Sequence, residues 1–438
     1  MTPVTTAALA PDPVLAGRDR LLDADAMAAH LSRLLGTDGP IAVASARLTL
    51  VKYRWAESLR VVYELDTVAG RQVVAARVFA SAELAARAAV AAVAAGVAAC
   101  THDPARHRGL HAVALDREHD AVWFTAPHDR RLRGLGALDT PLPHLAALPG
   151  GRWVGTELVQ CAPERSATLR CLDADGATVG YAKLYRHAAQ AADLARCYDH
   201  VVRGLALRGA GVRVPAAVTH DAALGVLVLE PMAGVGWNEL EPSRLPLVAR
   251  VIGAGLAEVH GLGRHGRPPF ERHQADKVAR SVELLVEARP DVAELARGVG
   301  ERLAATVPVA SAPVLLHGDV HPKNVLVDGD RVHLIDLDQA GWGSAAADMG
   351  SMIARLRHGV LVGETAGGTA GPLAASFLHG YATVRPVVSA AELRWHTAAA
   401  LVVERALRAV TRLHPAGLAV LAGTLADAHA VLDGRDDL

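Results

Sequence analysis

The sequence predicts an α+β protein, and two features of its hydrophobic pattern lead to that class. Residues 46–229 show the order of three strands, one helix and two strands twice in succession. Beyond Pro231 the pattern turns helical, apart from one strand-rich stretch at residues 314–338. Strands followed by helices along a chain are typical of α+β proteins.

The first copy of the repeated order follows a helix expected at about Asp23–Leu35. Its strands are expected at 46–53, 59–65, 73–79, 111–115 and 121–125, with a helix at 81–99. The strands of the second copy are expected at 157–161, 166–172, 180–185, 216–219 and 226–229, with a helix at 188–208. Aligning the copies sets Arg77 opposite Lys183. Shared periodicity alone could give this match, so the sequence leaves a true duplication open.

The helical part is expected to contain helices at 243–262, 274–306, 346–357, 371–383 and 389–413. From these patterns and the Gly150-Gly151 boundary we expect four segments. They are a flexible arm at 1–20, an N-terminal α/β cap domain at 21–148, a small β lobe at 149–232 and a helical large lobe at 233–438. The cap domain reads as an empty copy of the small lobe, because no catalytic motif follows it.

Composition excludes several classes of protein. Of 438 residues, 51% are apolar and 21% charged, which excludes a disordered or collagen-like chain. The net charge of −1 gives no field that would recruit nucleic acid or an acidic membrane, so neither is an expected partner. The longest lipid-like run, Ala88–Cys100, is shorter than the roughly 20 residues of a spanning helix. Without a basic n-region we expect a cytoplasmic protein with reduced thiols.

The strand-rich stretch at 314–338 carries the chemistry. Asp328-Gly329-Asp330 is a strong hairpin signal between two apolar runs. A turn at Gly329-Asp330 pairs Asn324 with Ile335 and sets Asn324 beside Asp336, within about 5 to 7 Å. A carboxylate and an amide oxygen at that separation can share Mg²⁺.

Asp319 lies on the same loop and is free to face a substrate hydroxyl. A carboxylate and two metal ligands are what phosphoryl transfer requires. An ordinary polar turn is the alternative, since aspartate is common in turns.

These residues also carry a family resemblance. HGDVHPKN, followed by LIDLDQAGWGSAAAD, resembles the catalytic loop and metal-binding segment of the aminoglycoside phosphotransferase family. The resemblance implies a bilobal protein-kinase-like fold, with a small antiparallel β lobe, a helical large lobe, and ATP and Mg²⁺ as cofactors. It implies Asp319 as catalytic base, Asn324 and Asp336 as magnesium ligands, His317 as a loop-bracing residue and Asp348 as a structural acid. The N-terminal domain is similar in placement to the cap of maltokinases.

The resemblance also indicates nucleotide-binding residues. In this fold a strand lysine binds the α/β-phosphates and an acid on the next helix positions it, which implies Lys183. The helix at 188–208 has no glutamate, so Asp199 is the candidate acid. No G-x-G-x-x-G is present, and the turn at 161–166 is either an ordinary turn or a phosphate loop assisted by Arg165 or Ser166. The backbone at Glu230 and Met232 is expected to bond adenine.

The acceptor is less defined. Arg405, Arg408 and Arg412 share one helical face, and Trp395 lies on the same predicted helix. Trp395 and Arg405 are candidates for contact with a neutral sugar or an anionic substrate; the alternative is that the arginines form a solvated face. Asp338 could help to hold a second metal if the strand that contains Asp336 continued; the alternative is an ordinary surface aspartate.

The sequence therefore predicts an ATP- and Mg²⁺-dependent phosphotransferase acting on a hydroxyl of a sugar, amino sugar or sugar-bearing natural product. Two alternatives stay open. One is a kinase for Ser/Thr hydroxyls of a peptide in natural-product biosynthesis. The other is a pseudokinase or nucleotide-binding scaffold, which the missing glutamate and the glycine-free loop favour.

Overall fold

The structure of the protein is a computed structural model that describes residues 9–15, 17–99, 109–132, 134–139, 143–263 and 266–435. The chain divides into two units. Unit 1 comprises Met1–Ala192, Ala217–Pro231 and Thr411–Leu413, and unit 2 comprises Asp193–Ala216, Met232–Val410 and His414–Leu438. Unit 1 holds two five-stranded sheets and unit 2 is mostly helical, so the predicted α+β class is confirmed.

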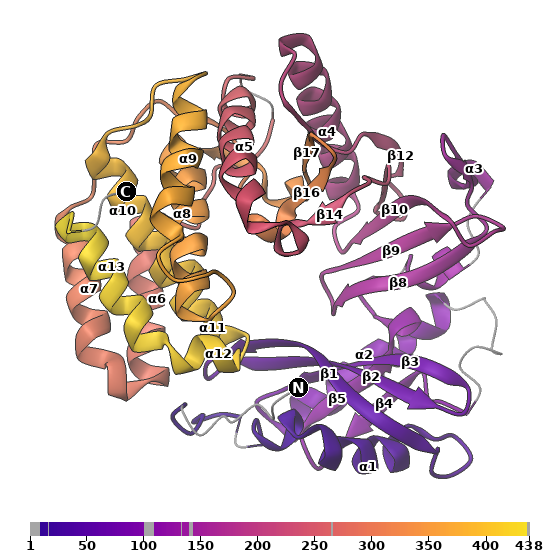
Figure 1. Ribbon diagram of the computed structural model, residues 1–438. Helices are drawn as coiled ribbons and strands as arrows, with labels where there is room; N and C mark the ends of the chain where they lie inside the picture. The colour runs from indigo at the N-terminus through magenta and orange to yellow at the C-terminus, as the bar shows by residue number, and fades with distance from the viewer. Residues whose placement is uncertain are drawn as a thin grey trace. The chain divides into compact units, whose positions relative to one another are not determined.

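The N-terminal sheet of unit 1 is antiparallel, in the order β1-β2-β3-β5-β4 (Figure 1). Its strands are β1 (Val43–Arg54), β2 (Ser58–Thr67), β3 (Gly70–Val78), β4 (Val113–Asp116) and β5 (Ala121–Thr125). Helix α1 (Ala24–Leu35) begins at the N-cap Asp23 and buries Met27, Leu31 and Leu35. Helix α2 (Ala82–Ala99) follows β3.

The second sheet of unit 1 repeats this order as β8-β9-β10-β13-β12. Its strands are β8 (Gly155–Ala162), β9 (Ser166–Leu172), β10 (Thr178–Tyr185), β12 (Ala217–Asp221) and β13 (Val226–Leu229), and helix α4 (Ala189–Arg208) follows β10. Arg77 in β3 pairs with Val122, the second residue of β5. Lys183 in β10 pairs with Leu227, the second residue of β13. The two basic residues therefore occupy equivalent positions of two sheets with the same topology.

The connection between the two sheets supplies part of the second sheet's core. Leu132, Leu135, Leu138 and Leu145 are all buried there. They pack in one apolar cluster with strand residues of the second sheet that include Leu169. These four leucines lie before the boundary expected at residue 149, yet they pack with the small β lobe.

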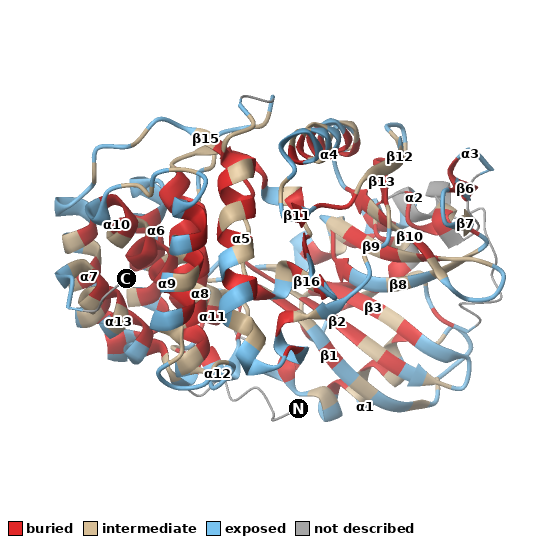
Figure 2. Ribbon diagram, turned by 45° about the horizontal axis from the view of Figure 1, so that its top comes forward, coloured by how far each residue is buried: buried red, intermediate tan, exposed pale blue. Residues whose placement is uncertain are grey.

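Unit 2 contains α5 (Leu245–His260), α6 (Ala275–Ala288), α7 (Ala293–Ala305), α8 (Ala345–Leu361), α9 (Ala370–Ala382), α10 (Ala390–Ala400), α11 (Leu407–Thr411), α12 (Pro415–Ala419) and α13 (Leu421–Asp433). Helix α8 is buried along most of its length (Figure 2). Helices α5 and α9 approach closely at Gly253 and Gly380. A Cβ at either glycine would lie 1.9 Å from a backbone oxygen of the other helix, so this packing requires glycine.

Short strands interrupt these helices. β11 (Val212–Arg213), β17 (Arg331–Leu334), β16 (Val325–Asp328) and β14 (Val235–Gly236) form one sheet in that order. β15 (Val314–Leu316) pairs with β18 (Gly341–Gly343). These strands hold the segment in which the sequence places the catalytic residues.

Three local expectations were wrong. The flexible arm is not loose over residues 9–15 and 17–20: Asp12 is buried, its Oδ1 accepts from the Leu15 N–H at 2.7 Å and its Oδ2 accepts from the Tyr53 hydroxyl. Residues 1–8 and residue 16 lie outside the described part. The helix expected at 274–306 breaks at Pro290, because proline cannot continue the helix before it. The helix expected at 389–413 is interrupted by a π-helical turn at Leu401–Ala406.

Two other expectations concern the membrane and the cysteines. None of the helices in the described ranges is long and apolar enough to cross a membrane. Cys161, Cys171 and Cys197 are buried free thiols, as expected, and burial raises the pKa of the Cys161 thiol to about 12. Cys100 lies outside the described residues.

Candidate functional site

The hairpin β16–β17 sets the register of the proposed metal ligands. Val325 pairs with Leu334 and Asp328 with Arg331, so the turn lies at Gly329-Asp330 as predicted. One step further along, the Ile335 N–H donates to the Asn324 carbonyl oxygen at 3.0 Å. Asn324 and Asp336 therefore emerge together from one end of the hairpin.

Asp348 holds the loop that precedes this hairpin. Its carboxylate is 1% exposed and accepts from the N–H groups of His317 and Gly318 at 2.7 and 2.9 Å. His260 Nε2 lies 3.2 Å from the same carboxylate. Gly318 has φ +81°, and a Cβ there would lie 2.0 Å from the Gln339 carbonyl oxygen, so no other residue fits. The loop is consequently fixed through its backbone, next to the acid.

His317 is fully buried beside this carboxylate. Burial lowers the pKa of His317, against the pull of Asp348, Asp319 and Asp336. Its Nδ1 accepts from the Asp319 N–H at 3.4 Å, so the neutral ring carries its hydrogen on Nε2. Nε2 has no hydrogen-bond partner among the residues that the structure describes. The ring braces the Asp319 backbone and leaves one buried donor.

The Asp319 side chain faces positive charge. Arg272 Nη1 lies 3.3 Å from Oδ1, and His321 Nε2 lies 3.7 Å from Oδ2. Burial raises the pKa of Asp319, but His321, Arg272 and Arg408 outweigh burial and hold it well below its ordinary value. Asp319 is therefore a carboxylate throughout the neutral range, suited to accept a hydrogen bond from a hydroxyl.

A buried acid anchors this arginine. Glu404 is 4% exposed, and its Oε1 accepts from Arg272 Nη1 at 2.9 Å and from Ser351 Oγ at 3.0 Å. His273 Nε2 lies 3.0 Å from the same oxygen. Burial raises the pKa of Glu404, yet His273, Arg272 and Arg405 together hold it well below its usual range. Glu404 thus positions Arg272 against Asp319.

No pattern in the sequence indicates this network. Glu404 lies in the π-helical turn at Leu401–Ala406, and π-turns frequently occur at functional sites. Arg272 precedes α6 in a loop without a motif. Only the folded chain brings the two residues together.

The structure corrects the expectation for Arg405. It was a candidate for substrate contact, or for a solvated face, but it is 5% exposed and pairs with Glu404 at 3.5 Å. Burial, together with Arg355 and Arg408, lowers the pKa of Arg405 to about 10 although Glu404 opposes this. The π-turn rotates Arg405 inward, so the residue cannot contact a substrate directly.

Trp395 is a second correction. It is 4% exposed, and its Nε1 donates to the Leu303 carbonyl oxygen at 2.9 Å. Its ring packs edge to face against His396. Trp395 belongs to the core of the helical unit and has no open face on which a sugar could stack.

Asp336 departs from strand geometry. Its φ of 73° and ψ of 67° are left-handed, which aspartate tolerates better than most residues but which still costs energy. The chain then forms a 3₁₀ turn at Leu337–Gln339, fixed by a 3.0 Å hydrogen bond from the Leu337 N–H to the Tyr198 hydroxyl. The strand does not continue, so the condition for placing Asp338 on the same face is not met.

The donor set fits a hard cation. Asn324 Nδ2 donates to the Asp319 carbonyl oxygen at 3.0 Å, which leaves Oδ1 of this amide as the acceptor. Asp336 follows Ile335, the residue paired with Asn324, so its carboxylate could supply a second oxygen ligand at this end of the hairpin. Magnesium is typically held by few protein oxygens and completed by phosphates and water.

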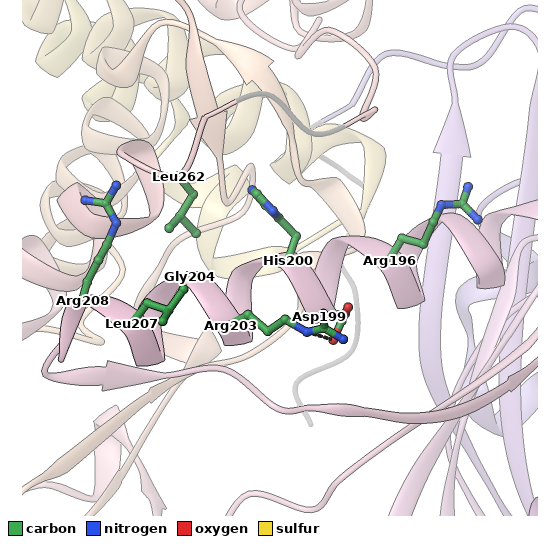
Figure 3. A pocket seen from close by; sticks show the side chains of 8 residues that line it. All are labelled: Arg196, Asp199, His200, Arg203, Gly204, Leu207, Arg208 and Leu262. Atoms are coloured by element: carbon green, nitrogen blue, oxygen red, sulfur yellow. Dashed lines mark ion pairs between the residues drawn. The ribbon is translucent and has the colours of Figure 1, made fainter.

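The residues expected to bind nucleotide have distinct surroundings. Lys183 lies in β10, the central strand of its sheet, half-buried between Thr168 and Leu227. Asp199 lies on α4, where Arg203 Nε is 2.9 Å from its Oδ1 (Figure 3). Asp199 also lines a pocket of about 550 Å³. Pairing of Lys183 with Asp199 stays a prediction.

Two amides of the β8–β9 turn are bonded within unit 1. The Arg165 N–H donates to the Ala162 carbonyl oxygen at 3.0 Å, and the Glu164 N–H donates to Asp129 Oδ2 at 2.6 Å. Ser166 begins β9, paired with Ala162. Two N–H groups that a phosphate loop would offer are therefore already bonded within unit 1.

No pattern in the sequence singles out Glu164, which lies at the tip of this turn. It is buried and makes ion pairs with Arg60 at 3.1 Å, Arg77 at 3.1 Å and Arg130 at 2.5 Å. Burial raises the pKa of Glu164, but the three arginines reverse this and lower it. The turn is thus bound to the N-terminal sheet through one carboxylate.

Glu230 and Met232 follow β13 directly, where the chain leaves unit 1 and enters unit 2. Both are half-buried. Their proposed contact with adenine stays a prediction.

Comparison with known proteins defines the class. The sequence profile of the phosphotransferase enzyme family matches residues 165–389, about half of the chain, and includes Lys183, Asp319, Asn324 and Asp336. The chain belongs to this family of phosphotransferases. The protein-kinase-like fold and the enzyme class expected from the sequence are thereby confirmed.

Solved structures show weaker similarity. An amicoumacin kinase in complex with AMP-PNP and Ca²⁺ is 15% identical, with 63% of this chain and 88% of that chain covered and a TM-score of 0.45. A macrolide 2′-phosphotransferase from Brachybacterium faecium is 17% identical, with coverages of 65% and 92% and a TM-score of 0.39. A choline/ethanolamine kinase family protein from Mesorhizobium loti is 19% identical, with coverages of 68% and 93% and a TM-score of 0.45. No curated protein matches the sequence.

Proposed function

We propose that the protein transfers the γ-phosphoryl group of ATP to a hydroxyl group of a small molecule. The observation that carries this proposal is the geometry around Asp319. This ionised side chain lies on a loop that Asp348 braces. The backbone carbonyl oxygen of Asp319 accepts a hydrogen bond from Asn324 Nδ2 at 3.0 Å. Phosphoryl transfer depends mainly on positioning and electrostatic stabilisation, which such a loop provides.

Each residue has a distinct role in this proposal. Asp319 accepts a hydrogen bond from the substrate hydroxyl and thereby orients the hydroxyl oxygen toward the γ-phosphorus atom of ATP. Asn324 and Asp336 would hold Mg²⁺, which supplies charge neutralisation on the phosphate oxygens. Lys183 would contact the α/β-phosphates, and the backbone at Glu230 and Met232 would bond the adenine edge. Asp199 is the candidate partner of Lys183.

The protonation state of Asp319 limits how it acts. Because its pKa lies well below the ordinary value, the carboxylate is a weak base and holds no proton at neutral pH. It therefore orients the hydroxyl early and receives the proton only late, once the oxygen–phosphorus bond has largely formed. A loose transition state with little charge on the nucleophile is compatible with such a base.

Charge near Asp319 supports a neutral or anionic acceptor. Four arginines interact electrostatically with this carboxylate: Arg272, Arg355, Arg405 and Arg408. Glu404 pairs with Arg272 and Arg405, and Glu364 pairs with Arg355, so the four arginines outnumber the two glutamates that pair with them. A polycationic aminoglycoside would meet like charge, which is unfavourable. We therefore place the acceptor among neutral sugars, anionic sugars and sugar-bearing natural products.

Turnover of radiolabelled ATP by the full-length protein tests this proposal. The acceptor panel should contain neutral sugars, sugars with a phosphate or carboxylate, and polycationic aminoglycosides. We expect labelled product from the first two groups and none above background from the third. Preferential labelling of an aminoglycoside would contradict the charge argument, and Asp319→Asn controls for contaminating kinases.

A nucleotide-binding protein without turnover is the second candidate, because two amides of the β8–β9 turn are already bonded. Saturable Mg²⁺-ATP binding without hydrolysis or transfer to any acceptor, a peptide pool included, would favour it. Transfer to serine or threonine of a peptide would instead support the peptide-kinase alternative.

A further inference from the structure

Three metal-binding side chains gather in unit 1, and the proposed reaction uses none of them. His30 comes from α1, and Glu118 and His119 come from the turn between β4 and β5. One nitrogen of each imidazole and one oxygen of Glu118 lie within 4.8 Å of one another. His30 Nδ1 and Glu118 Oε2 are 3.6 Å apart.

A buried carboxylate fixes both imidazoles. Asp116, 2% exposed, ends β4, and its Oδ2 lies 2.8 Å from His30 Nε2 and 2.9 Å from His119 Nδ1. Trp123 Nε1 donates to the same oxygen at 3.1 Å. Oδ1 accepts the N–H groups of Glu118 and His119. Because both oxygens are fully engaged, Asp116 cannot ligate a metal and acts on the imidazoles instead.

The hydrogen bonds to Asp116 determine which imidazole nitrogens remain available to bind a metal. An ionised carboxylate can only accept, so both imidazoles donate an N–H to Asp116. In the neutral rings the remaining nitrogens, Nδ1 of His30 and Nε2 of His119, carry lone pairs. A histidine that donates one N–H to a carboxylate and ligates through its other nitrogen is the usual arrangement at protein metal sites.

Glu118 completes the set. Its oxygen faces the Nδ1 lone pair of His30 at 3.6 Å, so two acceptors oppose each other unless a cation or a proton lies between them. Glu118 is 58% exposed, whereas His30 is 13% and His119 5% exposed, so a metal could enter from the Glu118 side. The geometry thus brings three metal-binding groups together with an orienting acid and access.

We propose that His30, Glu118 and His119 bind one divalent transition-metal ion of the zinc class. Two imidazoles and one carboxylate suit zinc, whereas magnesium and calcium prefer oxygen ligands alone. The open side leaves the fourth position of a tetrahedron for water. The bound ion links α1 to the β4–β5 turn and so stabilises the N-terminal sheet.

The test uses the full-length protein, stripped with a chelator and dialysed. Zinc affinity is measured by competition with a chromophoric chelator, Co²⁺ absorption reports the coordination geometry, and thermal unfolding is recorded with and without zinc. We expect one tight zinc per chain, a tetrahedral Co²⁺ spectrum and a raised Tm. Glu118→Gln and His30→Gln should each weaken zinc binding at least tenfold and abolish the Tm shift.

Glu83→Gln, an exposed carboxylate at the start of α2, is the matched control and should bind zinc as the wild type does. Equal zinc affinity of wild type and Glu118→Gln would place the metal elsewhere and overturn the proposal. So would a wild type that binds no stoichiometric zinc and shows no Tm shift. The His30–Glu118 contact would then be an ion pair of a protonated imidazole. Because Glu118 is exposed, its variant keeps the fold, and circular dichroism verifies this.

Discussion

Arg77 Nη1 lies 3.1 Å from Glu164 Oε2, and this ion pair joins the N-terminal sheet to the β8–β9 turn of the second sheet. Arg77 occupies the position in β3 that Lys183 occupies in β10. The basic residue of the first sheet is thus engaged by a carboxylate of the protein itself. The N-terminal sheet thus binds the β8–β9 turn, which stands at the position expected for a phosphate loop.

Glu164→Gln should destabilise unit 1 strongly. Removing this carboxylate leaves Arg60, Arg77 and Arg130 without their common partner, and breaking a buried ion pair typically costs about 3–5 kcal/mol. Urea unfolding gives the free energy of unfolding. Glu157→Gln is the matched control, since its pair with Arg170 is exposed and is expected to contribute about 0–1 kcal/mol. Equal effects of the two variants would contradict the account of Glu164.

The stabilisation by Glu164 should depend on pH. The arginines lower the pKa of Glu164 in the folded protein despite its burial. Its stabilisation is therefore fully present above the ordinary glutamate value of about 4.3 and is lost as the pH falls through the folded pKa. The stability difference between wild type and Glu164→Gln should shrink below about pH 4. A difference that grows on acidification would exclude an ionised Glu164.

Arg77→Ala and Lys183→Ala should separate the two sheets by function. Arg77→Ala is expected to lower stability but to leave ATP affinity within about twofold. This corresponds to a change in free energy of about 0.5 kcal/mol, which is usual for substitutions away from a site. Lys183→Ala should weaken ATP binding by about 10- to 100-fold, because a charged hydrogen bond of about 1.5–3 kcal/mol is lost. Calorimetry at a temperature at which both variants are folded decides this. The reverse order would mean that the N-terminal sheet binds the nucleotide.

Asp336→Asn should remove the magnesium dependence of ATP binding. Asparagine tolerates the left-handed φ of 73°, so the variant keeps the backbone and removes only the charge. ATP is titrated with and without magnesium, and Asp328→Asn, on the exposed side of the same hairpin, serves as control. An unchanged magnesium effect in Asp336→Asn would assign the metal to other ligands.

His321→Asn should move the acidic limb of the pH–rate profile to higher pH. Burial raises the pKa of Asp319, and His321 is the first of the groups that lower it. Asparagine preserves an acceptor for the Lys323 N–H that His321 Nδ1 accepts at 3.2 Å. The limb of kcat/KM reports the ionisation of Asp319 in the free enzyme. The exposed His220→Asn is the control, and identical profiles for wild type and His321→Asn would argue against Asp319 as the titrating group.

Local patterns were enough to predict much of this protein. Alternating strands and one hairpin turn gave the register of Asn324 with Ile335, because both depend on neighbours in sequence. The repeated strand order followed from the same periodicity. Both predictions concern backbone pairing between strands that are close in sequence.

What the sequence could not give depends on contacts between distant residues. The left-handed Asp336 ends a strand that the pattern would extend to Asp338. A π-turn rotates Arg405 inward onto Glu404, where a regular helix would keep it on the face of Arg408. Glu164 looked like an ordinary turn residue, since its three arginines lie 34 to 104 residues away. Burial of Trp395 likewise depends on packing against α7.

Phosphoryl transfer by Asp319→Asn tests the central claim most directly. Wild type and variant are compared with radiolabelled ATP and the best acceptor, while Mg²⁺-ATP affinity is measured on the same samples. Asp330→Asn, in the exposed hairpin turn, is the control. The account predicts that Asp319→Asn loses about 100- to 10,000-fold in kcat, with ATP affinity and Tm nearly unchanged. Turnover close to the wild-type rate in Asp319→Asn would contradict it.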